Sequence, residues 1–265
     1  MSSEIEQSSP YVEIHNRDAN GPVVLLCEHA SHHIPEQYHG LGLDPAHRHS
    51  HAAWDPGARA VAMKLSERLH APMVASRVSR LVYDCNRPPE APSAMPECSE
   101  VIDVPGNHNL TESQRSARID SVYRPFCDAV TSVLAQRAAH HLPTVLITIH
   151  SFTPNFHGRV RAVEIGILHD ADSRMADAML AQSQRLPHRR IQRNAPYGPE
   201  DGVTHSLKLH GIANGLANVM IEIRNDLVAT PDDEDAMAQE LLQLLHPALA
   251  TFELELASQK GKQDA

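Results

Sequence analysis

Three apolar segments of the chain each lead directly into ionisable side chains. Segments 23–27, 144–149 and 219–221 are followed by residues that include His29, His150 and Glu222, respectively. Open α/β sheets bind ligands beyond the carboxyl ends of their strands, so these side chains are predicted to share one rim. Two histidines and a carboxylate are the residue types of a zinc hydrolase, which needs metal ligands, an open position for water and a nearby base.

A catalytic zinc site needs three protein ligands. His29 and His150 are the first two that the pattern predicts. The third is either His32 or His33, which follow closely along the chain, or an acid from elsewhere. Asp55 is an attractive acid because it lies in a polar stretch where a loop leads into a helix. The same position suits a helix N-cap, which is its structural alternative.

Glu222 is the predicted catalytic base. A carboxylate beside the metal accepts the proton of the attacking water and later returns it to the leaving amine. An ion pair with Arg224 or Arg80 is the structural alternative for this residue. In that case Glu28 or Glu164 would be the next candidate for the base.

Arginines gather around the predicted site, although the chain has a formal net charge of −10. Arg80, Asn86 and Arg87 lie within one short stretch, and Arg224 follows the predicted base by two residues. Planar guanidinium groups bind carboxylates in a bidentate manner, so a small acidic substrate is predicted. Structural pairing of arginine with aspartate, for instance of Arg80 or Arg87 with Asp84, is the alternative.

The polar loop 194–202 is rich in turn-forming residues and contains Asn194 and Tyr197. Binding residues are common in loops that a rigid scaffold supports. Both side chains are therefore predicted substrate contacts.

Strands and helices must alternate to position these residues. Short apolar runs predict strands at 23–27, 73–76, 81–83, 144–149, 162–168 and 219–223. Helical spacing predicts helices at 56–70, 111–139, 172–185, 204–216 and 230–257. Segments 88–106 and 196–202 are predicted loops because they are rich in proline and turn formers. This alternation indicates a layered α/β domain with a largely parallel sheet.

The helix ends carry recognisable signals. Capping residues are expected to begin three helices, at Asp55, Thr111 and Thr230. Two prolines lie inside helical segments, and we expect Pro125 to kink its helix and Pro247 to break the last one.

The composition is typical of a globular protein, with 42% hydrophobic and 21% charged residues among 265. We expect one domain over residues 10–257, with flexible tails at 1–9 and 258–265. The net charge of −10 argues against nucleic acid or an anionic membrane as a partner. No apolar run is long enough to cross a bilayer, and the N-terminus is polar and acidic, so we expect a cytoplasmic protein with reduced cysteines.

Six segments, taken in order, resemble the N-formylglutamate amidohydrolase family. They are EHASHHIP from residue 28, WDPGA from 54, SRLVYDCNRP from 79, ITIHSFTP from 147, NAPYGPEDGVTH from 194 and MIEIRNDL from 220. The resemblance covers about residues 20–250, and its most specific piece is the stretch that begins at residue 79.

This resemblance implies a three-layer α/β/α sandwich with a mixed, mainly parallel sheet, similar to that of zinc carboxypeptidases. It also implies hydrolysis of N-formyl-L-glutamate to formate and glutamate, late in histidine breakdown, with a divalent metal such as zinc. The family's strand-end histidines, acids, and polar and basic positions match His29, His150, Asp55, Glu222, Arg80, Asn86, Arg87 and Arg224.

Two other functions compete with this one. The first keeps the chemistry and changes the substrate to another N-acyl amino acid or a small carboxylated amide. The second is a non-catalytic protein that binds an acidic metabolite. Glu222 favours an enzyme, because a binding protein has no use for a general base.

Overall fold

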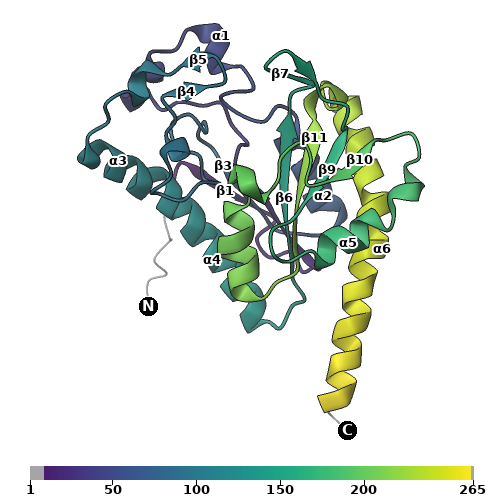
Figure 1. Ribbon diagram of the computed structural model, residues 1–265. Coiled ribbons are helices and arrows are strands. Elements are labelled where there is room, and N and C mark those ends of the chain that lie inside the picture. The colour runs from purple at the N-terminus through teal and green to yellow at the C-terminus, as the bar shows by residue number, and fades with distance from the viewer. Residues whose placement is uncertain (1–8, 264–265) are drawn as a thin grey trace, which may run out of the picture.

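A seven-stranded sheet forms the centre of the molecule (Figure 1). The computed structural model describes residues 9–263, with side chains through Phe252. In spatial order the strands are β1 (Val12–His15), β3 (Met73–Ser76), β2 (Val23–Cys27), β6 (Val145–Phe152), β11 (Asn218–Arg224), β9 (Ile165–Leu168) and β10 (Ile191–Arg193).

The middle of the sheet is parallel. Strands β3, β2, β6 and β11 all run in the same direction. At the edges, β1 is antiparallel to β3, β9 is antiparallel to β11, and β10 is parallel to β9. The predicted mixed, mainly parallel sheet is thus confirmed. Because the central strands run the same way, their carboxyl ends lie along one edge, where α/β sheets bind ligands.

Helices cover both faces of the sheet, which makes the predicted α/β/α sandwich. One face packs against α2 (Ala58–Arg68), α5 (Arg174–Leu180) and α6 (Pro231–Gln263). The other packs against α4 (Arg124–Ala139), which follows α3 (Glu112–Arg118) and a π-helical turn at Ile119–Tyr123.

Alternation along each central strand supplies both hydrophobic cores. Leu25 and Ile147 belong to the core beneath α2 and α6, whereas Leu26 and Leu146 belong to the core beneath α4. Successive side chains of a strand point to opposite faces, and here both faces are covered. This is why these strands read as continuous apolar runs rather than as alternating patterns.

Smaller elements complete the chain. The helix α1 spans Pro45–Arg48, and two hairpins pair β4 (Cys98–Ser99) with β5 (Ile102–Asp103) and β7 (Asn155–Phe156) with β8 (Arg159–Val160). Short 3₁₀ turns occupy Glu36–Gly42, Pro92–Ala94, Pro105–Asn107, Ser183–Arg185, Pro199–Asp201, Ile212–Asn214 and Asn225–Leu227, and a second π-helical turn occupies Leu207–Gly211. In Figure 1 the two hairpins stand on either side of the carboxyl edge of the sheet.

The prediction of a strand at 81–83 is wrong. Leu81, Val82 and Tyr83 are buried, but they form a turn. Their burial explains the apolar run. Side chains satisfy the carbonyl groups that a strand would have paired, because Asn107 donates to the Leu81 carbonyl and Arg118 to that of Val82.

Two strands of the central sheet and the four short strands of the hairpins were missed, and two predicted strands are longer than expected. The edge strands β1 and β10 have partly exposed residues and no continuous apolar run. The strands predicted at 144–149 and 219–223 extend to Phe152 and Arg224, respectively. His150 and Glu222 therefore lie within strands, which fixes their backbones in the hydrogen-bonded sheet.

The capping box at Thr111 is confirmed, with Gln114 as its partner, and α4 ends at Ala139 as predicted. The long helix is interrupted by the π-helical turn, and Pro125 follows that turn in the first turn of α4, where a missing N–H group needs no partner. The helix predicted at 172–185 is shorter, because α5 is followed by a 3₁₀ turn. The segment predicted as a helix at 204–216 forms a π-helical turn and a 3₁₀ turn in place of a regular α-helix.

The prediction that the last helix breaks at Pro247 and ends near residue 257 is wrong. Helix α6 continues through this proline to Gln263, and the hydroxyl of Thr230 accepts the Asp233 N–H at its start, as expected of a cap. Leu244, Leu245 and Ala248 are buried on the sheet on both sides of the proline, and this packing offsets the lost backbone hydrogen bond. Residues 1–8 and 264–265 of the expected tails lie outside the described residues.

No helix in the described part of the chain is long and apolar enough to cross a membrane. The four cysteines are free thiols. Cys27 and Cys85 are buried, Cys127 is half-buried and Cys98 is exposed.

Candidate active site

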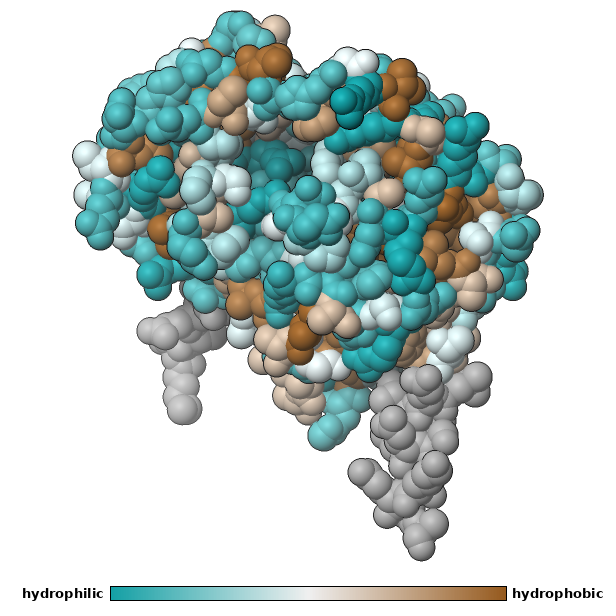
Figure 2. Space-filling view, in the orientation of Figure 1, coloured by the Kyte–Doolittle hydropathy of each residue, from teal (hydrophilic) through white to brown (hydrophobic). Residues whose placement is uncertain are grey.

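A polar pocket lies at the carboxyl edge of the parallel strands. Its volume is about 300 Å³, and His29, Asp55, Arg80, His150 and Glu222 are among its lining residues. Figure 2 shows a hollow lined by hydrophilic residues in the upper part of the molecule. A pocket of this size suits a small molecule rather than a polymer.

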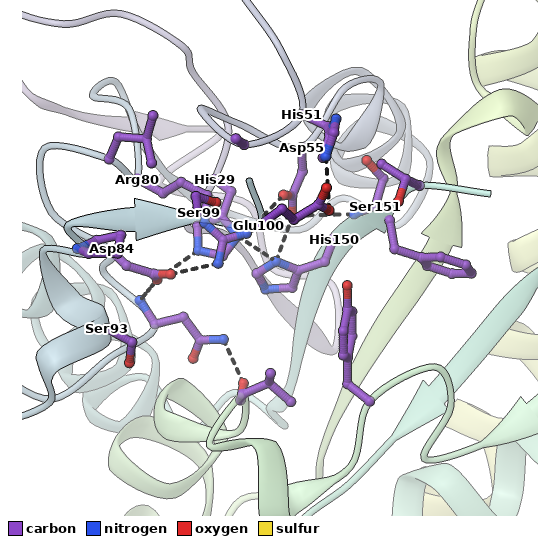
Figure 3. Close-up of a pocket in the computed structure, with 18 of the residues that line it drawn as sticks. His29, His51, Asp55, Arg80, Asp84, Ser93, Ser99, Glu100, His150 and Ser151 are labelled. Carbon is purple, nitrogen blue, oxygen red and sulfur yellow. Dashed lines mark hydrogen bonds and ion pairs between the residues drawn. The ribbon is translucent and has the colours of Figure 1, made fainter. Parts of the chain in front are cut away.

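Three buried side chains from separate segments converge in this pocket: His29 after β2, Asp55 before α2, and His150 in β6 (Figure 3). Asp55 Oδ2 lies 3.1 Å from His29 Nδ1 and 2.9 Å from His150 Nδ1. The two Nδ1 atoms lie 3.1 Å apart. We call His29, Asp55 and His150 the triad.

A carboxylate faces the other ring nitrogen of each histidine. His29 Nε2 lies 2.7 Å from Asp84 Oδ1, a distance at which Nε2–H donates to the carboxylate. His150 Nε2 lies 3.2 Å from Glu28 Oε2, as an ion pair without hydrogen-bond alignment. A proton on each Nε2, facing these carboxylates, would leave both Nδ1 lone pairs for an ion at the shared point.

The triad fits a divalent metal ion. Imidazole nitrogen and carboxylate oxygen are zinc ligands, and such atoms at about 2.0–2.1 Å from a tetrahedral ion lie about 3.3 Å from one another. The distances of 2.9–3.1 Å within the triad approach this value. Carboxylates behind ligating histidines are the usual outer partners of such sites.

The charge balance around the triad also favours a cation. Glu28, Asp55, Asp84 and Glu222 are each at most 5% exposed. Burial disfavours their ionised forms, yet His29, His150 and Arg80 hold the pKa values of Asp55 and Asp84 below their usual range. Burial likewise opposes the charged form of His150, but Glu28 and Asp55 raise its pKa well above the ordinary value.

The alternative third ligands do not reach the triad. His32 packs against His49 and Trp54, with ring centroids 4.5 and 5.0 Å away. The described groups of side chains that could hold a metal do not include His32 or His33.

Asp55 is not the N-cap of α2, contrary to the structural alternative. The cap is Gly57, and the Ala58 N–H donates to the backbone carbonyl of Asp55 instead of its carboxylate. That carboxylate is turned toward the histidines, where the Ser151 N–H donates to Oδ2 at 3.3 Å.

Glu222 lies beside the triad on the adjacent strand. It is the register partner of His150, so both side chains project from the same face of the sheet. Glu222 is 5% exposed, and its Oε2 has no hydrogen-bond partner. Burial raises the pKa of this carboxyl to about 7. Glu222 forms no ion pair with Arg80 or Arg224 within the described residues, so it is free to exchange a proton with a ligand.

The predicted arginines divide into two groups. Arg80 Nη2 donates to Asp84 Oδ2 at 2.7 Å, and Arg87 Nη1 donates to the Gly202 carbonyl at 2.9 Å, and both line the pocket. Arg224 does not line it. Its guanidinium is paired with Asp226 at 2.8 Å, so its predicted role in binding the substrate is not supported.

Of the other three residues predicted to contact the substrate, two line the pocket and one does not. Tyr197 lines the pocket. Asn86 does too, but its amide donates to the Val203 carbonyl and accepts from the Ser206 N–H, so it joins two loops. Asn194 accepts the His169 N–H through its side chain and lies outside the pocket lining, so its position does not support substrate contact.

Sequence reasoning missed the histidine partners. The sequence pattern presents Asp84 only as a partner for arginine and Glu28 only as a substitute base. An acid directly before His29 was the available signal for Glu28. Glu164, the other substitute base, is held by the Arg190 N–H at 2.8 Å and does not line the pocket.

An α/β/α sandwich with paired histidines, a shared aspartate and a buried carboxylate with a raised pKa has the architecture of a hydrolase. The chain belongs to the N-formylglutamate amidohydrolase family, whose model matches residues 21–229. It is an amidohydrolase.

Two solved structures are similar to the chain. A gene product of Agrobacterium tumefaciens is 56% identical with a TM-score of 0.90, over 92% of this chain and 96% of that one. N-formylglutamate amidohydrolase from Ralstonia eutropha is 18% identical with a TM-score of 0.66, over 91% of this chain and 97% of that one, and it supports the fold alone. No curated protein matches the chain.

Proposed function

We propose that the protein is a metal-dependent hydrolase that cleaves the formyl amide of N-formyl-L-glutamate, giving formate and glutamate. The observation that carries this proposal is the convergence of His29, Asp55 and His150 within 3.1 Å of one another, beside Glu222. The expected setting is histidine breakdown in the cytoplasm.

The triad would hold the ion, and Glu222 would handle the proton. A divalent ion bound there supplies Lewis acidity and lowers the pKa of water toward 7. The Glu222 carboxylate, with a pKa raised to about 7 by burial, accepts a proton from the attacking water near neutral pH. The same group then donates that proton to the leaving nitrogen, which departs as the amine of the amino acid.

Arginines on the pocket wall support an acidic substrate. Arg80 and Arg87 both line the pocket, and Arg87 forms no ion pair within the described residues. Arg80 forms ion pairs with Asp84 and Asp55, so it also holds these two carboxylates in position around the histidines. We assign Arg80, Arg87 and Tyr197 to substrate binding, and Asn86, Asn194 and Arg224 to supporting the loops around them.

The test is hydrolysis of a panel of N-formyl and N-acetyl amino acids by metal-depleted protein with and without added zinc. Formate or acetate release is measured directly. We expect zinc-dependent release that is fastest with N-formyl-L-glutamate. If zinc-dependent cleavage is fastest with a different member of the panel, that compound is the substrate in place of N-formyl-L-glutamate. Cleavage that survives metal depletion would refute the metal requirement.

A non-catalytic binding protein makes a different prediction. It would bind L-glutamate or its N-formyl derivative in calorimetry without releasing formate, with or without zinc. The matched control is the Glu222→Gln variant, which should bind like the wild type and release formate much more slowly.

A further inference from the structure

Beside the triad's pocket lies a second hollow with an unusual arginine. Arg161 lines this hollow together with Arg87, Phe156 and Tyr197, and the last three also line the first pocket. The two spaces are therefore contiguous. Nothing in the sequence analysis singled out Arg161.

Three aromatic rings surround the Arg161 guanidinium. Its central carbon lies 4.3 Å from the ring centroid of Phe156, 4.7 Å from that of Tyr197 and 5.5 Å from that of Phe152. The whole chain has only one Trp, five Tyr and four Phe, so this concentration around one cation is specific to the site. Rings that cover a guanidinium hold it by cation–π attraction and leave its N–H edges for a ligand.

The Arg161 guanidinium has no acidic partner among the described residues. The Thr153 carbonyl accepts from its Nη1 at a long 3.5 Å, and the Tyr197 hydroxyl, a neutral group, is its other hydrogen-bond partner there. Asp201 also lines the hollow, but its carboxylate accepts the Gly198 N–H at 2.8 Å. A cation fixed between rings and lacking a carboxylate is prepared to receive one from outside.

The backbone around Arg161 is rigid. Its N–H donates to the Pro154 carbonyl at 2.8 Å, which closes the base of the β7–β8 hairpin. Its own carbonyl accepts from Arg224 Nη1 at 3.3 Å. Arg224 therefore acts on this hollow by holding Arg161 in place.

The distance from the triad suits a glutamate side chain. His150 and Phe152 lie two residues apart on β6, on the same face and about 7 Å apart along the strand. An extended glutamate places its side-chain carboxyl carbon about 5 Å from its amide nitrogen. A substrate whose amide lies at the triad can therefore extend its distal carboxylate toward the Phe152 end of β6, where the Arg161 guanidinium lies.

We propose that Arg161, supported by Phe152, Phe156 and Tyr197 and assisted by Arg87, binds the side-chain carboxylate of the substrate and selects acidic over neutral N-acyl amino acids. This inference rests on the proposed function for the reaction itself. The carboxylate subsite is a separate claim and is tested separately.

The kinetic test compares N-formyl-L-glutamate with N-formyl-L-glutamine in the zinc-loaded enzyme. Arg161→Gln should raise KM for the glutamate compound about 10- to 100-fold, the range of a charge-assisted hydrogen bond. It should leave KM for the glutamine compound and both kcat values nearly unchanged. Arg161→Lys keeps the charge but not the planar fork, so its KM should be intermediate. The exposed Arg185, which bonds Gln182, supplies the control variant Arg185→Gln.

A binding measurement separates this subsite from the reaction. Glutarate, a plain dicarboxylate, should bind the zinc-loaded wild type in calorimetry, and Arg161→Gln should weaken that binding at least tenfold. If the wild type hydrolyses neither N-formyl compound, the proposed function fails while this binding result still supports the subsite. Equal KM changes for both substrates, or glutarate binding that is absent or unaffected by the variant, would overturn the subsite.

Discussion

Each histidine of the triad is oriented by what its outer nitrogen contacts. Asp84 faces His29 Nε2 at 2.7 Å, and Glu28 faces His150 Nε2 at 3.2 Å, so that both Nδ1 atoms point at Asp55. Three electron-pair donors at one point repel one another unless a proton or a cation lies between them. The residues therefore make predictions about metal content, about the base and about pH.

Purified wild-type protein should contain about one divalent ion per chain, measured by mass spectrometry of the metals. His29→Ala, His150→Ala and Asp55→Ala should each lose it, because a three-ligand site rarely survives the loss of one ligand. His32→Ala is the matched control, since His32 packs on Trp54 and His49 away from the triad. Retention of the ion in all three triad variants would contradict the assignment.

Glu222→Gln should lower kcat by about 10²–10⁴-fold, the usual contribution of a general base. Metal content and melting temperature should be retained, because Glu222 forms no ion pair within the described residues. Turnover, metal content and a thermal melt are measured on one sample. A folded, metal-loaded variant with near-normal kcat would exclude Glu222 as the base and direct attention to Glu28.

The rate should depend on pH through Glu222. Burial raises the pKa of this carboxyl to about 7, and only its ionised form accepts a proton. Consequently kcat/KM should rise with pH and level off above the pKa, and a bound cation should move the midpoint below 7 by favouring the charged form. The check is a pH–rate profile of the wild type and of Glu222→Gln. If kcat/KM falls in the same way at low pH in the wild type and in Glu222→Gln, a group other than Glu222 causes that fall.

At the scale of elements, strand ends and helix starts place the site. Strands β6 and β11 are in register at His150 and Glu222, so hydrogen bonds of the sheet fix the distance between ligand and base. Helix α2 begins just after Asp55 because Gly57 turns the chain with φ +80°, a conformation that L-residues rarely adopt. This turn directs Asp55 toward the histidines.

Gly57→Ala should therefore destabilise the protein by at least about 2 kcal/mol, from backbone strain and overpacking together. An added Cβ would lie 2.4 Å from Val228 Cγ2 and 2.7 Å from the Val228 carbonyl oxygen. Gly215→Ala is the matched control, because φ is +68° there with nothing within 4 Å of the added Cβ. Urea unfolding measures both variants, and equal losses of stability would show that the Val228 contact does not matter.

At the scale of the whole molecule, the triad joins three distant parts of the chain. Its members are separated by 26, 95 and 121 residues. They meet because the parallel strands bring their carboxyl ends to one edge while helices cover both faces. An ion that binds all three segments only in the folded state also stabilises the fold.

Chelation should lower the melting temperature of the wild type. Free metal at about 100 times its dissociation constant stabilises the folded state by about 2.7 kcal/mol, or about 5–10 °C at this chain length. His150→Ala should show no such difference between chelator and added zinc. The measurement is thermal unfolding by circular dichroism, and equal responses of variant and wild type would mean that the metal binds elsewhere.

The sequence by itself determined the buried strands of the central sheet, which are β2, β3, β6, β9 and β11, and the helices that cover them. Runs such as 23–27 and 219–223 are buried on both faces, so composition alone marks them as strands, and the residues that follow mark the site edge. It also pointed to His29, His150 and Glu222, because a strand and its carboxyl end are both local features of the chain. Segment 81–83 shows where this reasoning fails. It is buried but forms a turn, and a buried turn can have the same apolar pattern as a buried strand.

Only the tertiary structure decided which distant side chains meet. Asp55 rather than His32 joins the histidines, because a turn at Gly57 and packing against Trp54 set their directions. Arg161 rather than Arg224 faces the pocket region, because Asp226 already pairs with Arg224. Which side chains meet depends on contacts between segments far apart in the chain. The local sequence pattern does not determine the direction in which a side chain points.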